Sequence, residues 1–181
     1  MPNGSVLSGA EAMESIGVRP LKLEPRDGLA LASHSSFSVA AAAMGLYKTI
    51  SCLDRVQIAT AMTMEAFRAN LSPLDSFAQT VNPQPGLAEA AEQLSDLLRG
   101  SVLFDPAKAR RLQDPLSIRN AVQVHGALIS ALNFAIDTVE VEMNASSDNP
   151  VVDVARHTII SCGAYHTPHL TIAVETVSRA T

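Results

Sequence analysis

The chain has 181 residues, a formal net charge of -5, a hydrophobic content of 47% and an aromatic content of 4%. The acidic balance argues against nucleic acid or an anionic membrane surface as a partner, and the length favours a single domain, residues 1–181. Because no segment has the uninterrupted apolar length of a membrane span and the two cysteines form no CxxC pattern, we expect a cytoplasmic protein without a membrane partner.

The first predicted element is a short helix within residues 4–16. Ser8 is suited to be its N-cap, and Glu11, three residues on, completes a capping box. Further along, Asp27 and Gly28 form a dipeptide that is typical of turns. We therefore expect a break in the chain at Asp27-Gly28.

Two more helical segments follow. From residue 37 to about residue 70, apolar side chains recur at helical spacing, which predicts one helix or two consecutive ones. Residues 71–86 contain three prolines and a glycine and predict a connector. Residues 87–98 then predict a shorter, surface-type helix.

Residues 117–143 predict a long helix that is apolar on two neighbouring stripes. At about 1.5 Å per residue it spans about 40 Å, and Arg119 falls in its first turn. So broad an apolar surface is typical of a helix buried among other helices. The first stripe consists of Val122, His125, Ile129, Leu132, Ile136, Val139 and Met143, and the second of Ala121, Val124, Leu128, Ala131 and Ala135.

Two polar motifs flank this helix, QDPLSIR at 113–119 and NASSDNP at 144–150. They resemble the aromatic amino acid ammonia-lyases, the family of histidine and phenylalanine ammonia-lyases. That family has Gln-Asp-x-Tyr-Ser-x-Arg, then a long core helix, then Asn-Ser-x-x-Asp-Asn-Pro. Either motif alone is suggestive, whereas both at the family's separation are specific. After them, residues 151–161 predict a short hairpin or extended segment, and the last residues begin another helix.

The resemblance covers nearly the whole chain, but only the middle of the family's length. It implies an all-α fold, a long-helix bundle of the fumarase/aspartase-like ammonia-lyase type, of which this chain is an incomplete, central helical segment. It also implies a subunit or fragment of an enzyme that eliminates ammonia from an aromatic amino acid of the histidine, phenylalanine or tyrosine type.

The family's electrophile is a methylidene-imidazolone ring (MIO), which forms by cyclisation and dehydration of an internal Ala-Ser-Gly. This sequence contains no Ala-Ser-Gly. The resemblance therefore implies that MIO is supplied by a complementary lyase-like chain, as in a split enzyme or a fragment. We expect a hetero- or homo-oligomer with a tetramer-like core that acts on a small amino-acid-type substrate.

Three residues match catalytic or substrate-binding positions of the family. Arg119 matches the arginine that binds the substrate carboxylate, a role suited to a fork-shaped cation, although a structural salt bridge is the alternative. Gln113 matches a glutamine that lines the substrate and electrophile region, against the alternative of a loop cap. Tyr165 matches an aromatic residue beside the electrophile, and an ordinary core position is equally open to it.

Two positions depart from the family pattern. Leu116 stands where the family has a tyrosine near the substrate amine, and leucine cannot transfer a proton. Ser33 stands where the family has an asparagine that contacts the electrophile, and serine carries no amide. With both polar groups changed, we expect weak lyase activity even on an intact fold, unless a partner chain replaces the lost groups.

The histidines give weaker signals. His166 and His169 flank Pro168 without a carboxylate or thiol cluster to complete a metal site, so we expect no metal. His125 lies on the apolar stripe of the long helix, which favours a core or interface position. His34 replaces a small family glycine and is placed to rim a pocket.

Three functions remain open from the sequence. The first is an ammonia-lyase subunit completed by other chains. The second is the same scaffold with altered chemistry, such as an aminomutase, an addition or a cyclisation reaction. The third is a non-catalytic scaffold subunit that stabilises an active partner. An electrophile's absorbance in a purified complex would separate the first two from the third.

Overall fold

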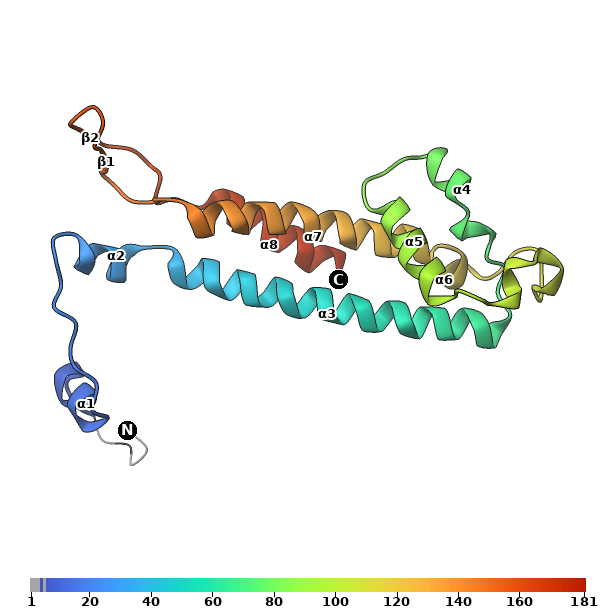
Figure 1. Cartoon of the computed structure of the whole chain (residues 1–181), viewed down its shortest axis with the longest axis horizontal. Helices are drawn as coiled ribbons and strands as arrows, with labels where there is room; N and C mark the ends of the chain where they lie inside the picture. Colours follow the sequence, from blue (N-terminus) through green and yellow to red (C-terminus); the bar gives the residue numbers. More distant parts are fainter. Residues whose placement is uncertain (1–3, 5) are drawn as a thin grey trace. The chain divides into compact units, whose positions relative to one another are not determined.

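The computed structural model describes residue 4 and residues 6–181, which fall into two compact units that divide after His34 (Figure 1). The smaller unit contains helices α1 (Gly9–Ser15) and α2 (Asp27–Ser33). The predicted capping box of α1 is confirmed: the backbone N–H of Ser8 donates to Oε2 of Glu11 at 2.8 Å, and the N–H of Glu11 donates back to Oγ of Ser8 at 3.3 Å.

The predicted turn at Asp27-Gly28 is wrong by two residues. The turn is at Pro25 and Arg26, and Asp27 begins α2. The carboxylate of Asp27 accepts the N–H of Glu24 at 2.8 Å, so it closes the preceding turn instead of forming part of it. Local Asp-to-backbone bonds of this kind serve equally well before a helix and inside a turn.

The larger unit is a helical bundle with one small hairpin, which confirms the all-α prediction. Helix α7 is central and packs against α3, α5 and α8, and α3 also contacts α5 (Figure 1). Three 3-10 turns lie at 72–74, 102–104 and 106–108. The α-helices are α3 (Ser36–Phe67), α4 (Ser76–Thr80), α5 (Leu87–Leu97), α6 (Leu116–Arg119), α7 (Ala121–Asn144) and α8 (Pro168–Ala180). Strands β1 (Val151–Asp153) and β2 (Thr158–Ile160) pair antiparallel, with Val151 opposite Ile160.

The long helix predicted for residues 117–143 is in fact two helices. Asn120, with φ -98° and ψ 14°, leaves the helical region and separates the single turn of α6 from α7. Asparagine favours such boundaries because its side chain competes with the helical backbone for hydrogen bonds. Arg119 therefore lies in the last turn of a short helix, not in the first turn of the long one.

A close contact of two glycines joins α5 to α7. Gly86 precedes α5 with a φ of 81°, and its α-carbon faces the backbone carbonyl of Gly126 in α7 so closely that no side chain would fit. The hydroxyl of Ser130 donates to the carbonyl oxygens of Pro85 and of Gly126, the latter at 3.0 Å. The N-terminus of α5 is thereby fixed on the N-terminal half of α7.

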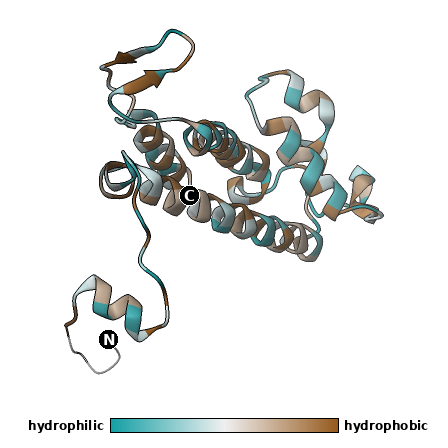
Figure 2. Cartoon of the chain, turned by 60° about the vertical axis from the view of Figure 1, so that its left-hand side comes forward, coloured by the Kyte–Doolittle hydropathy of each residue, from teal (hydrophilic) through white to brown (hydrophobic). Residues whose placement is uncertain are grey.

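The apolar stripes of α7 are buried only in part. The first stripe is buried from Val122 to Val139 apart from Ile136, which packs against the core, whereas Met143 is exposed. In the second stripe the alanines are buried and Val124 is exposed. Figure 2 shows apolar positions on several sides of the long helices. The chain thus covers one side of α7 and leaves apolar surface on the other.

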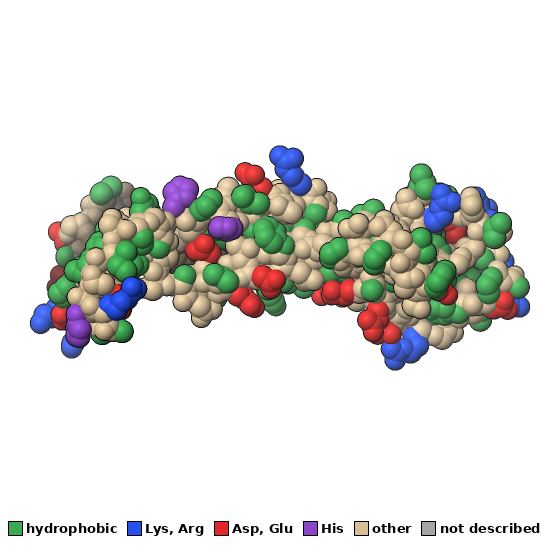
Figure 3. Space-filling view, turned by 90° about the horizontal axis from the view of Figure 1, so that it is seen from above, with side chains coloured by type: hydrophobic (Ala, Val, Ile, Leu, Met, Phe, Trp, Pro, Cys, Tyr) green, Lys and Arg blue, Asp and Glu red, His purple; other side chains and the backbone are tan. Residues whose placement is uncertain are grey.

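Helix α3 exposes more apolar surface still. Phe37 is 87% exposed, Tyr47 76% and Met62 68%. Figure 3 looks down from above the view of Figure 1, on the side away from α3, and hydrophobic side chains are scattered over that face as well. Isolated exposed apolar residues are ordinary, whereas a whole series of them along one helix is unusual for a domain that stands alone.

By length and composition alone, α3 and α7 would be able to cross a membrane, each with a mean hydropathy of 1.2 over an 18-residue window. This corrects the expectation that no segment reaches that length. Long core helices of bundles meet the same criterion, and α7 is packed by three other helices of its own unit.

Candidate functional site

The candidate site lies where the loop before α6 meets the C-terminal end of α3. A cavity of about 330 Å³ opens there, and both Gln113 and Arg119 line it. Arg119 is half-buried and Gln113 is exposed. The structure thus brings together two of the predicted site residues. The other lining residues are Asn70, Ser72, Pro73, Leu112 and Asp114.

A set of hydrogen bonds fixes this loop on the end of α3. The buried carboxylate of Asp114 accepts the backbone N–H of Asn70 at 2.7 Å, and the amide of Asn70 donates to the carbonyl oxygen of Leu112 at 2.8 Å. The guanidinium of Arg68 donates to the carbonyl oxygen of Lys108 at 2.8 Å. The wall of the cavity is therefore held by side chains on both segments.

Asn70 and Asp114 are site residues that the sequence reasoning did not single out. Their bond joins residues 44 positions apart, so no local pattern announces it. The available signal was compositional, since Asn70 is a polar residue directly before the predicted connector.

Leu116 does not line the cavity. It lies in the single turn of α6 with 59% of its surface exposed. Ser33 is the exposed last residue of α2, in the smaller unit. Both side chains are thus exposed, and the roles predicted for them remain predictions.

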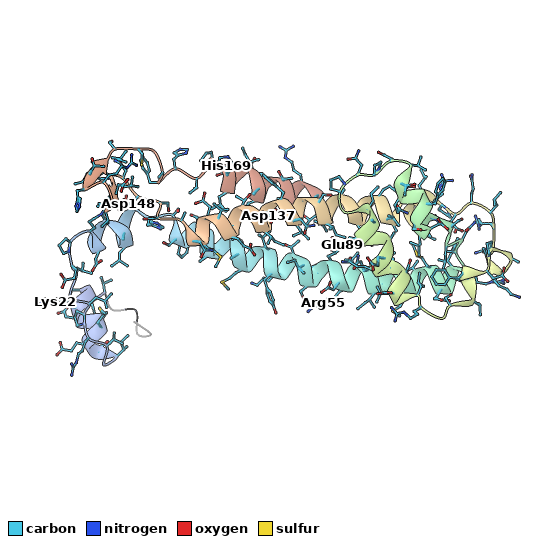
Figure 4. All side chains as sticks on the ribbon, turned by 45° about the horizontal axis from the view of Figure 1, so that its top comes forward. Lys22, Arg55, Glu89, Asp137, Asp148 and His169 are labelled. Atoms are coloured by element: carbon cyan, nitrogen blue, oxygen red, sulfur yellow. The ribbon has the colours of Figure 1, made fainter. Side chains whose placement is uncertain are left out.

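Tyr165 lies at the other end of α7 from the cavity. It is 53% exposed and sits between β2 and α8, in the segment bounded by Asp148 and His169 in Figure 4. The 24 residues of α7 separate this segment from Arg119 by about 36 Å at 1.5 Å per residue. One copy of the chain therefore does not place Tyr165 and Arg119 in the same site.

Comparison with known proteins decides the family. The model of the aromatic amino acid lyase family matches residues 1–181. This chain belongs to the aromatic amino acid lyase family. The histidine ammonia-lyase of Symbiobacterium thermophilum is 35% identical over 178 residues, which are 98% of this chain and 35% of the relative. That of Paracidovorax citrulli is 33% identical over 179 residues, with the same shares of 98% and 35%.

Solved structures show the same fold. The ergothioneine-degrading enzyme ergothionase of Treponema denticola matches with a TM-score of 0.84 and 30% identity, over 98% of this chain and 36% of the other. The phenylalanine ammonia-lyase of Rhodosporidium toruloides matches with a TM-score of 0.82 and 27% identity, over 97% and 27%. This lyase-family chain thus spans about a third of the length of the relatives that it matches.

The polar loop after α7 in this lyase-family chain is a hydrogen-bonded scaffold. The side-chain oxygen of Asn149 accepts the backbone N–H of Cys162 at 2.8 Å, which joins the two ends of the β1–β2 hairpin. The side chain of Asn144 donates to the carbonyl oxygen of Glu140 at 2.8 Å and lies back along α7. The loop thereby fixes the position of Cys162, where the segment that carries Tyr165 begins.

The histidines are spread over different elements. His125 is buried on α7, where burial lowers the pKa of its imidazole, and its Nδ1 has no hydrogen-bond partner. This agrees with the core position favoured by the sequence. His166 precedes α8 and His169 lies in its first turn, and the described residues contain no group of three or more His, Cys, Asp or Glu side chains placed to hold a metal.

Proposed function

We propose that this chain is a subunit or fragment of an ammonia-lyase-like enzyme that eliminates ammonia from an aromatic amino acid of the histidine, phenylalanine or tyrosine type. Its MIO electrophile is supplied by another chain, and the protein is soluble and cytoplasmic. The observation that carries this proposal is the cavity that Gln113 and Arg119 share, in a chain that belongs to the aromatic amino acid lyase family.

In this proposal Arg119 binds the substrate carboxylate. Its guanidinium is half-buried and makes no ion pair or hydrogen bond within the part of the chain that the structure describes, so its donors are available. A planar guanidinium can bond both oxygens of a carboxylate, which fixes the direction as well as the place of the substrate. Gln113 provides a neutral donor and acceptor beside it.

The placement of Tyr165 supports an assembly of several chains. Because α7 separates Tyr165 from Arg119 by about 36 Å, the two side chains act on one substrate only if they come from different copies or different chains. The exposed apolar residues of α3 and α7 support the same conclusion, since a partner's helices would cover them. We propose a hetero- or homo-oligomer with a tetramer-like core.

The family is MIO-dependent, and the polar lining by Gln113 and Arg119 fits a place beside such a group. When bound, MIO supplies the electrophile that captures the substrate. This chain's own residues then hold the substrate by its carboxylate at Arg119 and contribute the amide of Gln113. Leu116 offers no hydroxyl and Ser33 no amide, so these two positions fit the group less well.

The same two positions favour altered chemistry on the same scaffold as the second candidate function. Leucine in place of a proton-handling tyrosine changes which step the site can assist. The similarity to the Treponema denticola enzyme, which degrades ergothioneine, supports a search beyond the common aromatic amino acids. An aminomutase, an addition or a cyclisation reaction belongs to this candidate.

The test is reconstitution with a lyase-family chain that contains Ala-Ser-Gly. The purified complex is assayed for ammonia release from histidine, phenylalanine and tyrosine, and for turnover of ergothioneine. We expect ammonia release that Arg119→Gln reduces through a raised KM. Turnover without ammonia release supports altered chemistry instead. A complex with the electrophile's absorbance and activity that does not depend on this chain would reduce it to a scaffold subunit.

A further inference from the structure

The carboxylate of Asp114 lines the candidate site, and one of its oxygens has no hydrogen-bond partner. Among the described residues that line the cavity, Asp114 is the one acid and Arg119 the one cation. Asp114 is only 7% exposed. Its Oδ2 accepts the N–H of Asn70, whereas its Oδ1 is buried without a hydrogen-bond partner. The carboxylate therefore satisfies one oxygen inside the protein and leaves the other without a donor.

A buried carboxylate oxygen without a donor is costly, because hydration is lost and nothing replaces it. Arg119 lies half-buried on the same cavity with unused donors. Opposite charges on one partly enclosed cavity attract each other more strongly than they would in open water. Arg119 thus has hydrogen-bond donors without an acceptor, and Asp114 has an acceptor oxygen without a donor.

The other arginines near the cavity are already engaged. The guanidinium of Arg68 donates to the carbonyl oxygen of Lys108. Those of Arg110 and Arg111 lie 5.2 and 5.3 Å from the centre of the Phe67 ring, at cation–π distance. Of the arginines near the cavity, Arg119 is thus the one whose guanidinium is available to bond Asp114.

We propose that Asp114 is a positioning residue that holds the guanidinium of Arg119 inside the cavity and orients it toward the substrate carboxylate. This inference rests on the proposed function, which gives that carboxylate to Arg119. The described residues show no ion pair between these two side chains, so the proposed pair forms when the Arg119 side chain turns toward Asp114. One edge of the guanidinium then bonds Oδ1 and the other edge stays open to the substrate, since arginine carries five donors in a planar fork. The tether to Asn70 fixes the carboxylate, and the single turn of α6 lets Arg119 adjust without disturbing α7.

A double-mutant cycle on the full chain tests the pair directly. Asp114→Asn keeps an oxygen for the N–H of Asn70 but removes the charge, and Arg119→Gln removes the guanidinium. Urea unfolding is measured for both single variants and the double variant. We expect the two changes to be coupled by about 2- to 5-fold in the unfolding equilibrium constant, and less at high salt. The control pair, Asp114→Asn with Arg111→Gln, should be additive. Additivity of the Arg119 pair overturns the proposal.

A second measurement needs no variant of Asp114. The exchange of the Arg119 Nε–H with water, followed by NMR, should be slower than that of Arg55 on α3, because a bonded guanidinium is protected. Exchange as fast as that of Arg55 contradicts the pair even if Asp114→Asn fails to fold.

The link to function is tested in the reconstituted complex by the binding of cinnamate and imidazolylacrylate, carboxylates that ammonia elimination from phenylalanine and histidine would leave. Arg119→Gln should weaken binding of the accepted acrylate by about 10-fold or more, and Asp114→Asn by about 2- to 5-fold. If Arg119→Gln changes nothing, the proposed function fails. If Arg119→Gln weakens binding and Asp114→Asn does not, only the role of Asp114 fails.

Discussion

Replacement of Gly126 by alanine tests how tightly α5 is seated on α7. An added Cβ would lie 2.6 Å from Cδ2 of Leu87 and 3.0 Å from its Cα. The methyl group of Leu87 can rotate away, but its Cα is part of the α5 backbone, so the whole N-terminus of α5 must move. That movement also stretches the bond from Ser130 to Pro85.

Overpacking of this kind costs about 1–3 kcal/mol, and the better helix propensity of alanine recovers about 0.5–1 kcal/mol. The midpoints of these two ranges leave a net loss, so we expect Gly126→Ala to lower the free energy of unfolding by about 1 kcal/mol. The assay is urea unfolding followed by circular dichroism at one fixed protein concentration, because association would otherwise shift the midpoint.

The matched control is Gly45→Ala in α3, where an added Cβ meets nothing within 4 Å. The same substitution should there raise stability by about 0.5–1 kcal/mol. If Gly126→Ala unfolds at the same urea concentration as the parent chain or at a higher one, the contact is looser than described and the reasoning fails.

Three further outcomes are expected. Leu116→Tyr combined with Ser33→Asn should raise the rate of ammonia release by the reconstituted complex. One restored acid–base group can contribute up to about 100- to 10,000-fold, and the effects of the two changes need not multiply. An unchanged or lower rate would indicate that Leu116 instead shapes the pocket for a different substrate or reaction. Because burial lowers the pKa of His125, the folded chain binds fewer protons there than the unfolded chain, so stability should fall as pH drops below 6.5; His125→Leu should flatten this dependence in urea titrations. The isolated chain should associate in sedimentation, and a stable monomer would contradict the inferred partner surface.

Local signals in the sequence were enough for much of the fold. The capping box joins Ser8 to Glu11, only three residues apart, so it can be read from the sequence. The apolar spacing that predicted α3, α5 and α7 arises because each helix packs a face against the core. The break at Asn120 was not predicted, because the apolar spacing of α7 continues up to this residue. Only the backbone angles of Asn120 interrupt the helix, and the sequence pattern does not report them.

The candidate site was predictable only in part. The family motif pointed to Gln113 and Arg119, and in the structure both line one cavity; their predicted roles remain predictions. The bond from Asp114 to Asn70 depends on how α3 ends against a loop 44 residues later, which no spacing rule reveals. That Tyr165 lies at the far end of α7 follows from the packing of α8 along α7 and not from its motif.

The length of α7 has a genetic consequence for the proposed oligomer. A copy that carries a defect at Arg119 damages one composite site, and a copy that carries a defect at Tyr165 damages another. In an assembly that mixes the two defective chains, some sites receive both defects and others receive neither. Two inactive variants, one from each end of the helix, would then restore part of each other's activity when they are expressed together.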